Sequence, residues 1–136
     1  MFKNIDTAFA FQEKALALRG YRQQLLASNV ANADTPNYKA VDIDFGKALE
    51  QARNSVGGGV ALTVTSPGHI KNAGSGAMDG VKPMYRAATQ PSIDGNTVDM
   101  NVEQAQFSEN ALRYLTTLQF INSKFRDVSY VLRGGN

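Results

Sequence analysis

Two carboxylates separated by one residue are the first candidates for chemistry in this sequence. Asp42 and Asp44 would face the same side of a strand, where they could form a metal site or an acid–base pair. No histidine, third carboxylate at ligand spacing or calcium-loop pattern accompanies them. We therefore interpret both side chains as the solvated face of an edge strand. The sequence predicts no metal site and no cofactor.

The lone histidine and a run of glycines are equally weak candidates. His69 follows a Ser-Pro-Gly turn sequence at 66–68, and no nucleophile motif of the Gly-x-Ser-x-Gly kind is present to make it catalytic. The three glycines at 57–59 lack the Lys-Ser/Thr of a phosphate-binding loop, so we interpret them as a flexible linker. The aromatic residues of the C-terminal segment lie among mixed charges and are more typical of packing than of base stacking. We expect no catalytic residues and no enzyme.

Composition narrows the class of protein further. The 136 residues are 43% hydrophobic and 19% charged, which excludes a wholly disordered chain. The 14 basic residues are nearly balanced by 12 acidic ones, which excludes a polyelectrolyte. The absence of cysteine excludes disulfides, Cys-ligated zinc and thiol nucleophiles. No run of 18 apolar residues predicts a membrane span, and the N-terminus lacks the pattern of a cleaved signal peptide. We expect a chain that is cytoplasmic, or exported with its N-terminus intact.

Glycine and proline divide the chain into three parts. Residues 54–97 hold eight of the twelve glycines and three of the four prolines, whereas 1–35 contain one glycine and 98–133 neither residue type. The first part predicts one helix, roughly from Ile5 to Ala33, which ends before Pro36. Asn37 then suits a left-handed turn.

The last part predicts a second long helix, from about Asn101 to Arg133. Asn101 would cap it, with Gln104 at the spacing of a capping box, and Gly134 would stop it. Apolar residues recur at helical spacing on both long helices, and a hairpin of two helices cannot cover stripes of this width. We expect the uncovered surface to lie against other chains. The predicted assembly residues are Ile5, Phe9, Leu16, Leu26, Val30, Leu112, Leu115, Leu118, Phe125, Val128 and Leu132.

The middle of the chain carries weaker signals. The alternation over 41–45 predicts a short extended run, and Phe45, Ala48 and Ala52 predict a short helix near 45–53 with Asp44 as its cap. A strand at 62–66 is also compatible with the sequence. Large apolar side chains between 54 and 97 are too few for an independent core, so we expect this segment to order against its neighbours.

The stretch from Leu26 to Tyr38 resembles the N-terminal signature of bacterial flagellar rod and hook proteins, in which a helix ends in an Asn-x-x-Asn-x-x-Thr-Pro-Gly-Tyr-like turn. Asn37 stands where that pattern often has glycine. Similarity continues through 41–45, 65–69 and 97–103 and on to Tyr114, so it spans the chain. The residues assigned to this signature turn are Asn29, Asn32, Thr35, Pro36, Asn37 and Tyr38.

Within that family, the short chain resembles a proximal rod protein. Its length excludes the distal rod and hook proteins, which are longer. The related proximal rod protein FlgC is the nearest alternative, although its turn usually lacks the plain Thr-Pro-Asn/Gly-Tyr form. A cytoplasmic helical adaptor or export chaperone would share the amphipathic ends. The resemblance implies a mainly α fold, in which two long terminal helices pair as an antiparallel, coiled-coil-like hairpin around a Gly/Pro-rich middle of loops and short β-strands. We expect 1–36 and 98–136 to form this helical core and 37–97 to be an insert.

The resemblance also implies a function. Such proteins are structural subunits of the flagellar basal body, exported by the flagellar type III apparatus without a cleaved signal peptide and polymerised in the periplasmic space into the rod that carries torque from membrane ring to hook. The implied partners are other rod subunits (FlgC and the distal rod proteins), the adaptor FliE, the export gate and the membrane ring. No nucleic acid, small-molecule substrate or cofactor is implied. Asn29 and Asn32 are candidates for hydrogen bonds to exposed backbone at the helix end.

Overall fold

The computed structural model describes residues 2–57, 81–88 and 92–134, with the side chains of 2–5 and 55–57 outside the described set. The described elements are α1 (Phe2–Ala31), β1 (Val41–Asp42), α2 (Phe45–Gly57), β2 (Met84–Tyr85) and α3 (Met100–Leu132). The predicted strand at 62–66, the glycines at 58 and 59, and His69 lie outside the described residues.

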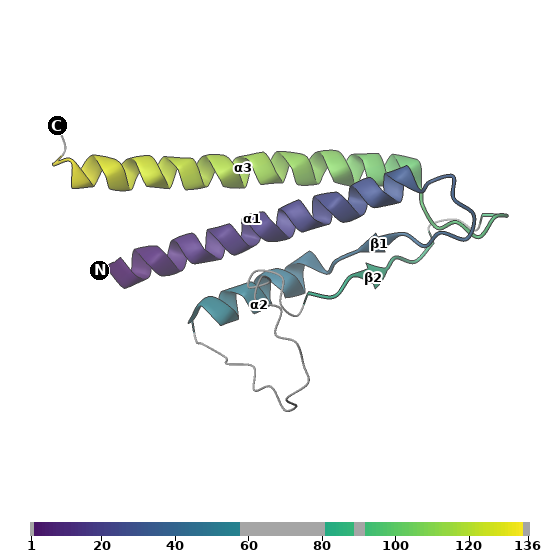
Figure 1. Cartoon of the computed structure of the whole chain (residues 1–136), viewed down its shortest axis with the longest axis horizontal. Helices are drawn as coiled ribbons and strands as arrows, with labels where there is room; N and C mark the ends of the chain where they lie inside the picture. Colours follow the sequence, from purple (N-terminus) through teal and green to yellow (C-terminus); the bar gives the residue numbers. More distant parts are fainter. Residues whose placement is uncertain (1, 58–80, 89–91, 135–136) are drawn as a thin grey trace, which may run out of the picture.

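The long helices α1 and α3 lie side by side and antiparallel, so that both chain ends point to the same end of the molecule (Figure 1). Helix α1 is in the middle, because it packs on both α3 and α2, and no contact between α2 and α3 occurs in the described part of the chain. The predicted mainly α fold with a terminal helical hairpin is therefore confirmed. Facing pairs along the hairpin are Asn29 with Glu103, Gln23 with Asn110, Gly20 with Tyr114, and Phe9 with Phe125.

Helix α1 ends two residues before the predicted end. The amide of Asn32 bonds to the carbonyl oxygens of Ser28 and Asn29, and that of Ala33 bonds to Val30, so the chain tightens into a turn after Ala31. Asn37 has φ of 59°, as its place after Pro36 predicts.

Helix α3 is capped by Asp99, and the prediction of Asn101 as the cap was wrong. The Asp99 backbone is extended, and its Oδ1 accepts from the amides of Asn101 at 3.0 Å and Val102 at 3.3 Å. Asn101 already lies in the first turn, so the predicted capping box with Gln104 does not form. The stop at Gly134 is as predicted, with φ of 82°.

A two-residue antiparallel ladder joins the middle of the chain to its return segment. Val41 pairs with Tyr85 and Asp42 with Met84, and the amide of Arg86 extends the ladder by bonding to the carbonyl oxygen of Ala40 at 2.8 Å. Helix α2 follows directly and runs four residues beyond its predicted end. Its cap is the predicted one, because Asp44 Oδ1 accepts from the amide of Lys47 at 3.1 Å.

The apolar core is small and lies where α1, β1 and α2 meet. Leu18, Ile43, Ala48 and Ala52 form its buried cluster, and much of α3 remains exposed to solvent. In the described part of the chain, no helix is long and apolar enough to cross a membrane. The hairpin therefore positions two features, a cluster of polar and charged side chains at its closed end and exposed apolar side chains along α3.

Candidate functional site: a polar joint and an exposed helix face

The turn after α1 is held by the segment that precedes α3. The Nδ2 atom of Asn96 lies 2.8–3.0 Å from the carbonyl oxygens of Asn32, Ala33 and Thr35, and the Asn96 side chain is buried. Its two protons therefore bridge three carbonyl oxygens of the turn, of which those of Asn32 and Thr35 also accept from the amides of Thr35 and Tyr38. Sequence reasoning missed Asn96. The available signal was the turn-rich Asp-Gly-Asn sequence at 94–96 just before α3.

Asn37 and Gly95 sit against each other with left-handed backbones. The amide of Asn37 bonds to the carbonyl oxygen of Asp94 at 2.9 Å, and Gly95 has φ of 74°. A Cβ atom at Gly95 would lie 2.6 Å from Asn37 Oδ1, so this position requires glycine. Tyr38 closes the turn, because its carbonyl oxygen accepts from the amide of Thr97 at 3.0 Å.

Asn29 is fully buried and behaves like an inserted peptide group. Its Nδ2 donates to the carbonyl oxygen of Val41 at 2.9 Å and its Oδ1 accepts from the amide of Val41 at 3.0 Å. The same Nδ2 also donates to Glu103 Oε2 at 3.1 Å. Asn32 stays local, with its Nδ2 2.8 Å from the carbonyl oxygen of Ser28. Asn29 therefore fixes where the chain leaves α1, while Asn32 completes the last turn.

Four charged side chains meet beside Asn29. Arg22 holds Asp42 through two parallel bonds of 2.9 Å, from Nε to Oδ1 and from Nη2 to Oδ2. Arg86 bridges Asp42, at 2.7 Å, and Glu103. Gln106 Oε1 accepts from both guanidinium groups, at 3.0 and 2.9 Å. We call the set Arg22, Asn29, Asp42, Arg86, Glu103 and Gln106 the polar joint.

The interpretation of Asp42 as a solvated side chain was wrong. Only 16% of its side chain is exposed, and both of its oxygens accept from arginines. Asp44 does not share its surroundings, since it caps α2. The described residues contain no group of acidic, histidine or cysteine side chains that could hold a metal ion. Asp42 and Asp44 therefore have structural roles at two separate places.

Charge in the polar joint is balanced, with two guanidinium groups facing two carboxylates. Burial by itself would raise the pKa of Asp42, but the hydrogen bond and charge of Arg22, the amide of Ile43, and Arg86 together lower it. The hydrogen bond to Asp42 raises the pKa of Arg22 in turn. Asp42 and Arg22 therefore stay ionised, and the polar joint ties α1, β1, the segment after β2 and α3 together.

A second buried polar contact lies further along the hairpin. Asn110 is 1% exposed, and its Nδ2 donates to the carbonyl oxygen of Arg19 at 2.9 Å and to Gln23 Oε1 at 2.6 Å. The guanidinium of Arg19 stacks over the ring of Phe45, 4.6 Å from its centroid. Burial, followed by the charges of Arg113 and Arg22, lowers the pKa of Arg19. Together with the polar joint, Asn110 fixes the register of α1 against α3 at two places.

The predicted assembly residues fall into distinct environments. Leu26 is fully buried inside the chain, and the side chain of Ile5 lies outside the described set. Partly buried side chains are Phe9, Leu16, Val30, Leu118 and Val128. Exposed side chains are Leu112, Leu115, Phe125 and Leu132. The structure therefore exposes four of the six α3 members of the set to solvent, where another chain can reach them.

The face of α3 that carries Leu112 and Leu115 is exposed to solvent. Leu112 and Leu115 are 66% and 55% exposed, and residues 114–123 contain no charged side chain. The hydroxyl groups of Thr116 and Thr117 donate to carbonyl oxygens four residues back, at 2.9 and 2.8 Å. Because these donors are satisfied within the helix, the face can be covered without losing their hydrogen bonds.

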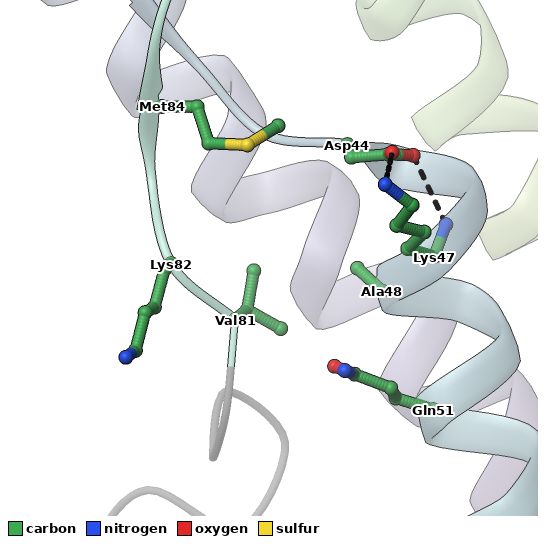
Figure 2. A pocket seen from close by; sticks show the side chains of 7 residues that line it. All are labelled: Asp44, Lys47, Ala48, Gln51, Val81, Lys82 and Met84. Atoms are coloured by element: carbon green, nitrogen blue, oxygen red, sulfur yellow. Dashed lines mark hydrogen bonds and ion pairs between the residues drawn. The ribbon is translucent and has the colours of Figure 1, made fainter.

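A small open groove lies between α2 and the return segment (Figure 2). Its volume is 160 Å³, and its lining is mostly apolar, from Ala48, Val81 and Met84. Polar side chains surround it, and Lys47 and Asp44 pair with each other at 3.3 Å. The groove lacks convergent polar groups of the kind that orient a small-molecule substrate.

Comparison with known proteins agrees with the signature turn. The family described as "Flagella basal body rod protein" matches residues 9–39. "Flagellar basal body rod protein FlgB" of Salmonella typhimurium is 46% identical over 139 residues, with all of both chains covered. The proteins of that name from Escherichia coli K12 and Proteus mirabilis are 43% and 40% identical, with at least 99% of this chain and all of each relative covered. Full-length similarity at this level shows that the chain belongs to the FlgB family of flagellar basal body rod proteins.

Proposed function

We propose that this chain is a structural subunit of the flagellar rod that assembles through the exposed face of α3 and the partly buried edges of the α1–α3 hairpin. Family membership supports the place in the rod of the basal body. The role requires no chemical step, and we assign no catalytic residue to it. Torque would pass through many packed helices, which fits a subunit whose long helices are its dominant element.

The observation that carries the assembly role is the exposed pair Leu112 and Leu115. Exposed leucines are unfavourable in water, and burying each would contribute roughly 1.5–3 kcal/mol. Leu115 lies within 114–123, ten residues free of charge. Phe125 and Leu132, nearer the end of α3, are exposed as well, and Phe125 also contacts Phe9 of α1. A surface of this extent is typical of a subunit that is completed by its neighbours.

The polar joint and signature turn have a different part in the proposal. They fix where the insert leaves the helical hairpin, so that 1–36 and 98–136 act as the assembly core and 37–97 as an insert joined to it. The buried contacts of Asn29 and Asn96 support this assignment. We propose that neighbours in the assembly are other rod subunits, including FlgC and distal rod proteins, with the adaptor FliE, the export gate and the membrane ring at the base. The same proposal includes export by the flagellar type III apparatus.

A charge on the exposed face of α3 tests the assembly role. Leu115→Asp should abolish or strongly reduce swimming and remove the chain from isolated basal bodies, because a carboxylate would be buried between subunits. Leu115→Met is the matched control and should swim normally. Circular dichroism of both purified variants should match the parent chain, since Leu115 is exposed in the subunit. Normal swimming of cells with Leu115→Asp would contradict the proposal. Retention of the parent chain in the cytoplasmic fraction, which is expected of an adaptor, would contradict it as well.

A further inference from the structure

The loop over 92–95 presents one large apolar side chain to solvent. Ile93 is fully exposed, although the backbone around it is well fixed. The amide of Gly95 bonds to the carbonyl oxygen of Ser92 at 3.2 Å, and the amide of Asn96 bonds to Asp94 Oδ1 at 3.1 Å. A single exposed apolar residue is ordinary on a surface. This one differs because its loop is held in a defined position.

Bonds to the turn after α1 fix the loop on the subunit. The carbonyl oxygen of Asp94 accepts from the amide of Asn37 at 2.9 Å, and that of Gly95 accepts from Lys39 Nζ at 2.7 Å. The loop therefore belongs to the closed end of the hairpin, where α1 ends and α3 begins (Figure 1). Ile93 is a pre-positioned knob, so its docking would cost little ordering entropy.

The α2–β2 groove is a suitable receptor for such a side chain. At 160 Å³ it has room for one branched aliphatic side chain and is too small for a helix. Its walls are Ala48, Val81 and Met84, and the flexible thioether of Met84 lets the groove adapt to a partner. It opens beside the start of α2, on the other side of the β1–β2 ladder from the loop that carries Ile93 (Figures 1 and 2).

Charge at the two surfaces is complementary. Asp94 follows Ile93, and hydrogen bonds from Ser92 and from the amide of Asn96 lower its pKa, so it is anionic at neutral pH. Lys82 follows Val81 at the rim of the groove and has no ion pair within the described part of the chain. The apolar knob thus has a carboxylate beside it and the apolar groove an ammonium, so that the two surfaces have opposite charge.

We propose that Ile93 of one subunit seats in the α2–β2 groove of a second copy of this chain, with Asp94 of the first beside Lys82 of the second. The proposal rests on the proposed function, which requires copies to pack in a row. Knob and groove are different surfaces of the subunit, so the contact is heterologous. Repetition of such a contact builds an open helical array and does not close a dimer.

Cysteine cross-linking tests the contact directly, because the chain has no cysteine of its own. The double variant Ile93→Cys/Gln51→Cys places one thiol on the knob and one beside the groove. Basal bodies isolated from cells with this variant as the only copy should give, after oxidation, a ladder of multiples of the chain mass on a non-reducing gel. The pair Gln24→Cys/Gln51→Cys is the control, since Gln24 is exposed on α1 away from the knob, and it should stay monomeric.

Several results would overturn the contact. They are a monomer with an internal disulfide, an adduct whose mass is not a multiple of the chain, and no ladder from a variant that is present in basal bodies. The last result would leave the proposed function intact, whereas absence of the parent chain from basal bodies would refute both. If the variant is not incorporated, purified single variants can be mixed. Ile93→Cys should then couple to Gln51→Cys at least about tenfold faster than Gln24→Cys does, and equal rates would refute the contact.

Discussion

The side-chain amide of Asn29 donates to Glu103 Oε2 across 3.1 Å, and both side chains are almost completely buried. Asn29 also holds both backbone groups of Val41, while Glu103 accepts from Arg86. This one contact therefore joins the end of α1 to β1, to the return segment and to the first turn of α3. A change at either residue acts on the closure of the hairpin and on the docking of the insert together.

Replacing the Asn29 amide by a carboxylate should destabilise the subunit strongly. Asn29→Asp keeps the size but loses the donor to Val41 and Glu103 and places a second carboxylate beside Glu103. We expect a loss of about 3–5 kcal/mol in the free energy of unfolding at pH 7, measured by urea denaturation. Asn32→Asp makes the same chemical change at a less buried helix end and should cost about 1 kcal/mol or less. Equal losses in the two variants would contradict the role given to Asn29.

The cap of α3 can be tested with two substitutions two residues apart. Asp99→Ala removes the oxygen that accepts from Asn101 and Val102, and should cost about 0.5–2 kcal/mol in unfolding free energy. Asn101→Ala should cost less than about 0.5 kcal/mol, because that exposed side chain caps nothing. Thermal denaturation of both variants distinguishes them. A larger loss of unfolding free energy for Asn101→Ala than for Asp99→Ala would show that Asn101 is the cap, as the sequence predicted.

The sequence predicted the helices well because their signals are local. Segments free of glycine and proline, apolar spacing and the stop before Pro36 placed both long helices within a few residues of their observed ends. The cap of α3 was misplaced because Asp99 and Asn101 are both good capping residues. Extended backbone at Asp99, which local propensity does not reveal, decides between them.

The polar joint could not be predicted, because its partners come from distant segments. Asp42 contacts Arg22 and Arg86, which are 20 and 44 residues away along the chain. Alternating apolar and charged residues at 41–45 are typical of a half-solvated strand, and only the tertiary structure brings two arginines to Asp42. Asn96 was missed for the same reason, since the carbonyls that it covers lie more than 60 residues earlier.

Asp42 should make the subunit sensitive to acid. Its pKa is lowered in the folded chain, so its contribution is fully present above the unfolded value of about 3.9 and is lost as the pH falls through the folded value. The parent chain should therefore lose stability below about pH 4. Asp42→Asn leaves two partly buried arginines with one carboxylate and should be less stable by about 1–3 kcal/mol at pH 7, with a flatter acid limb. Urea denaturation between pH 7 and 2 measures both chains. If the difference in unfolding free energy between the two chains stays constant over this range, the role assigned to Asp42 is contradicted. Asp6→Asn is the charge-matched control outside the polar joint.

Gly95 and Gly46 should respond in opposite directions to the same substitution. Gly95→Ala forces a side chain into a left-handed backbone and brings Cβ to 2.6 Å from Asn37 Oδ1, so we expect a loss of about 1–3 kcal/mol in unfolding free energy. Adding Asn37→Gly removes the clashing oxygen and should recover part of this loss, but the cost of the backbone conformation at 95 remains. Gly46→Ala lies in the first turn of α2, where its Cβ would meet Asp44 Oδ1 at an ordinary 3.5 Å, and should stabilise by about 0.5–1 kcal/mol. Urea denaturation of the parent chain and the three variants separates the cost of the clash from the cost of the backbone conformation at Gly95. Asn37→Gly relieves the clash but not the backbone cost. Full recovery in the double variant would assign the whole cost to the contact with Asn37, and no recovery would assign it to the backbone alone.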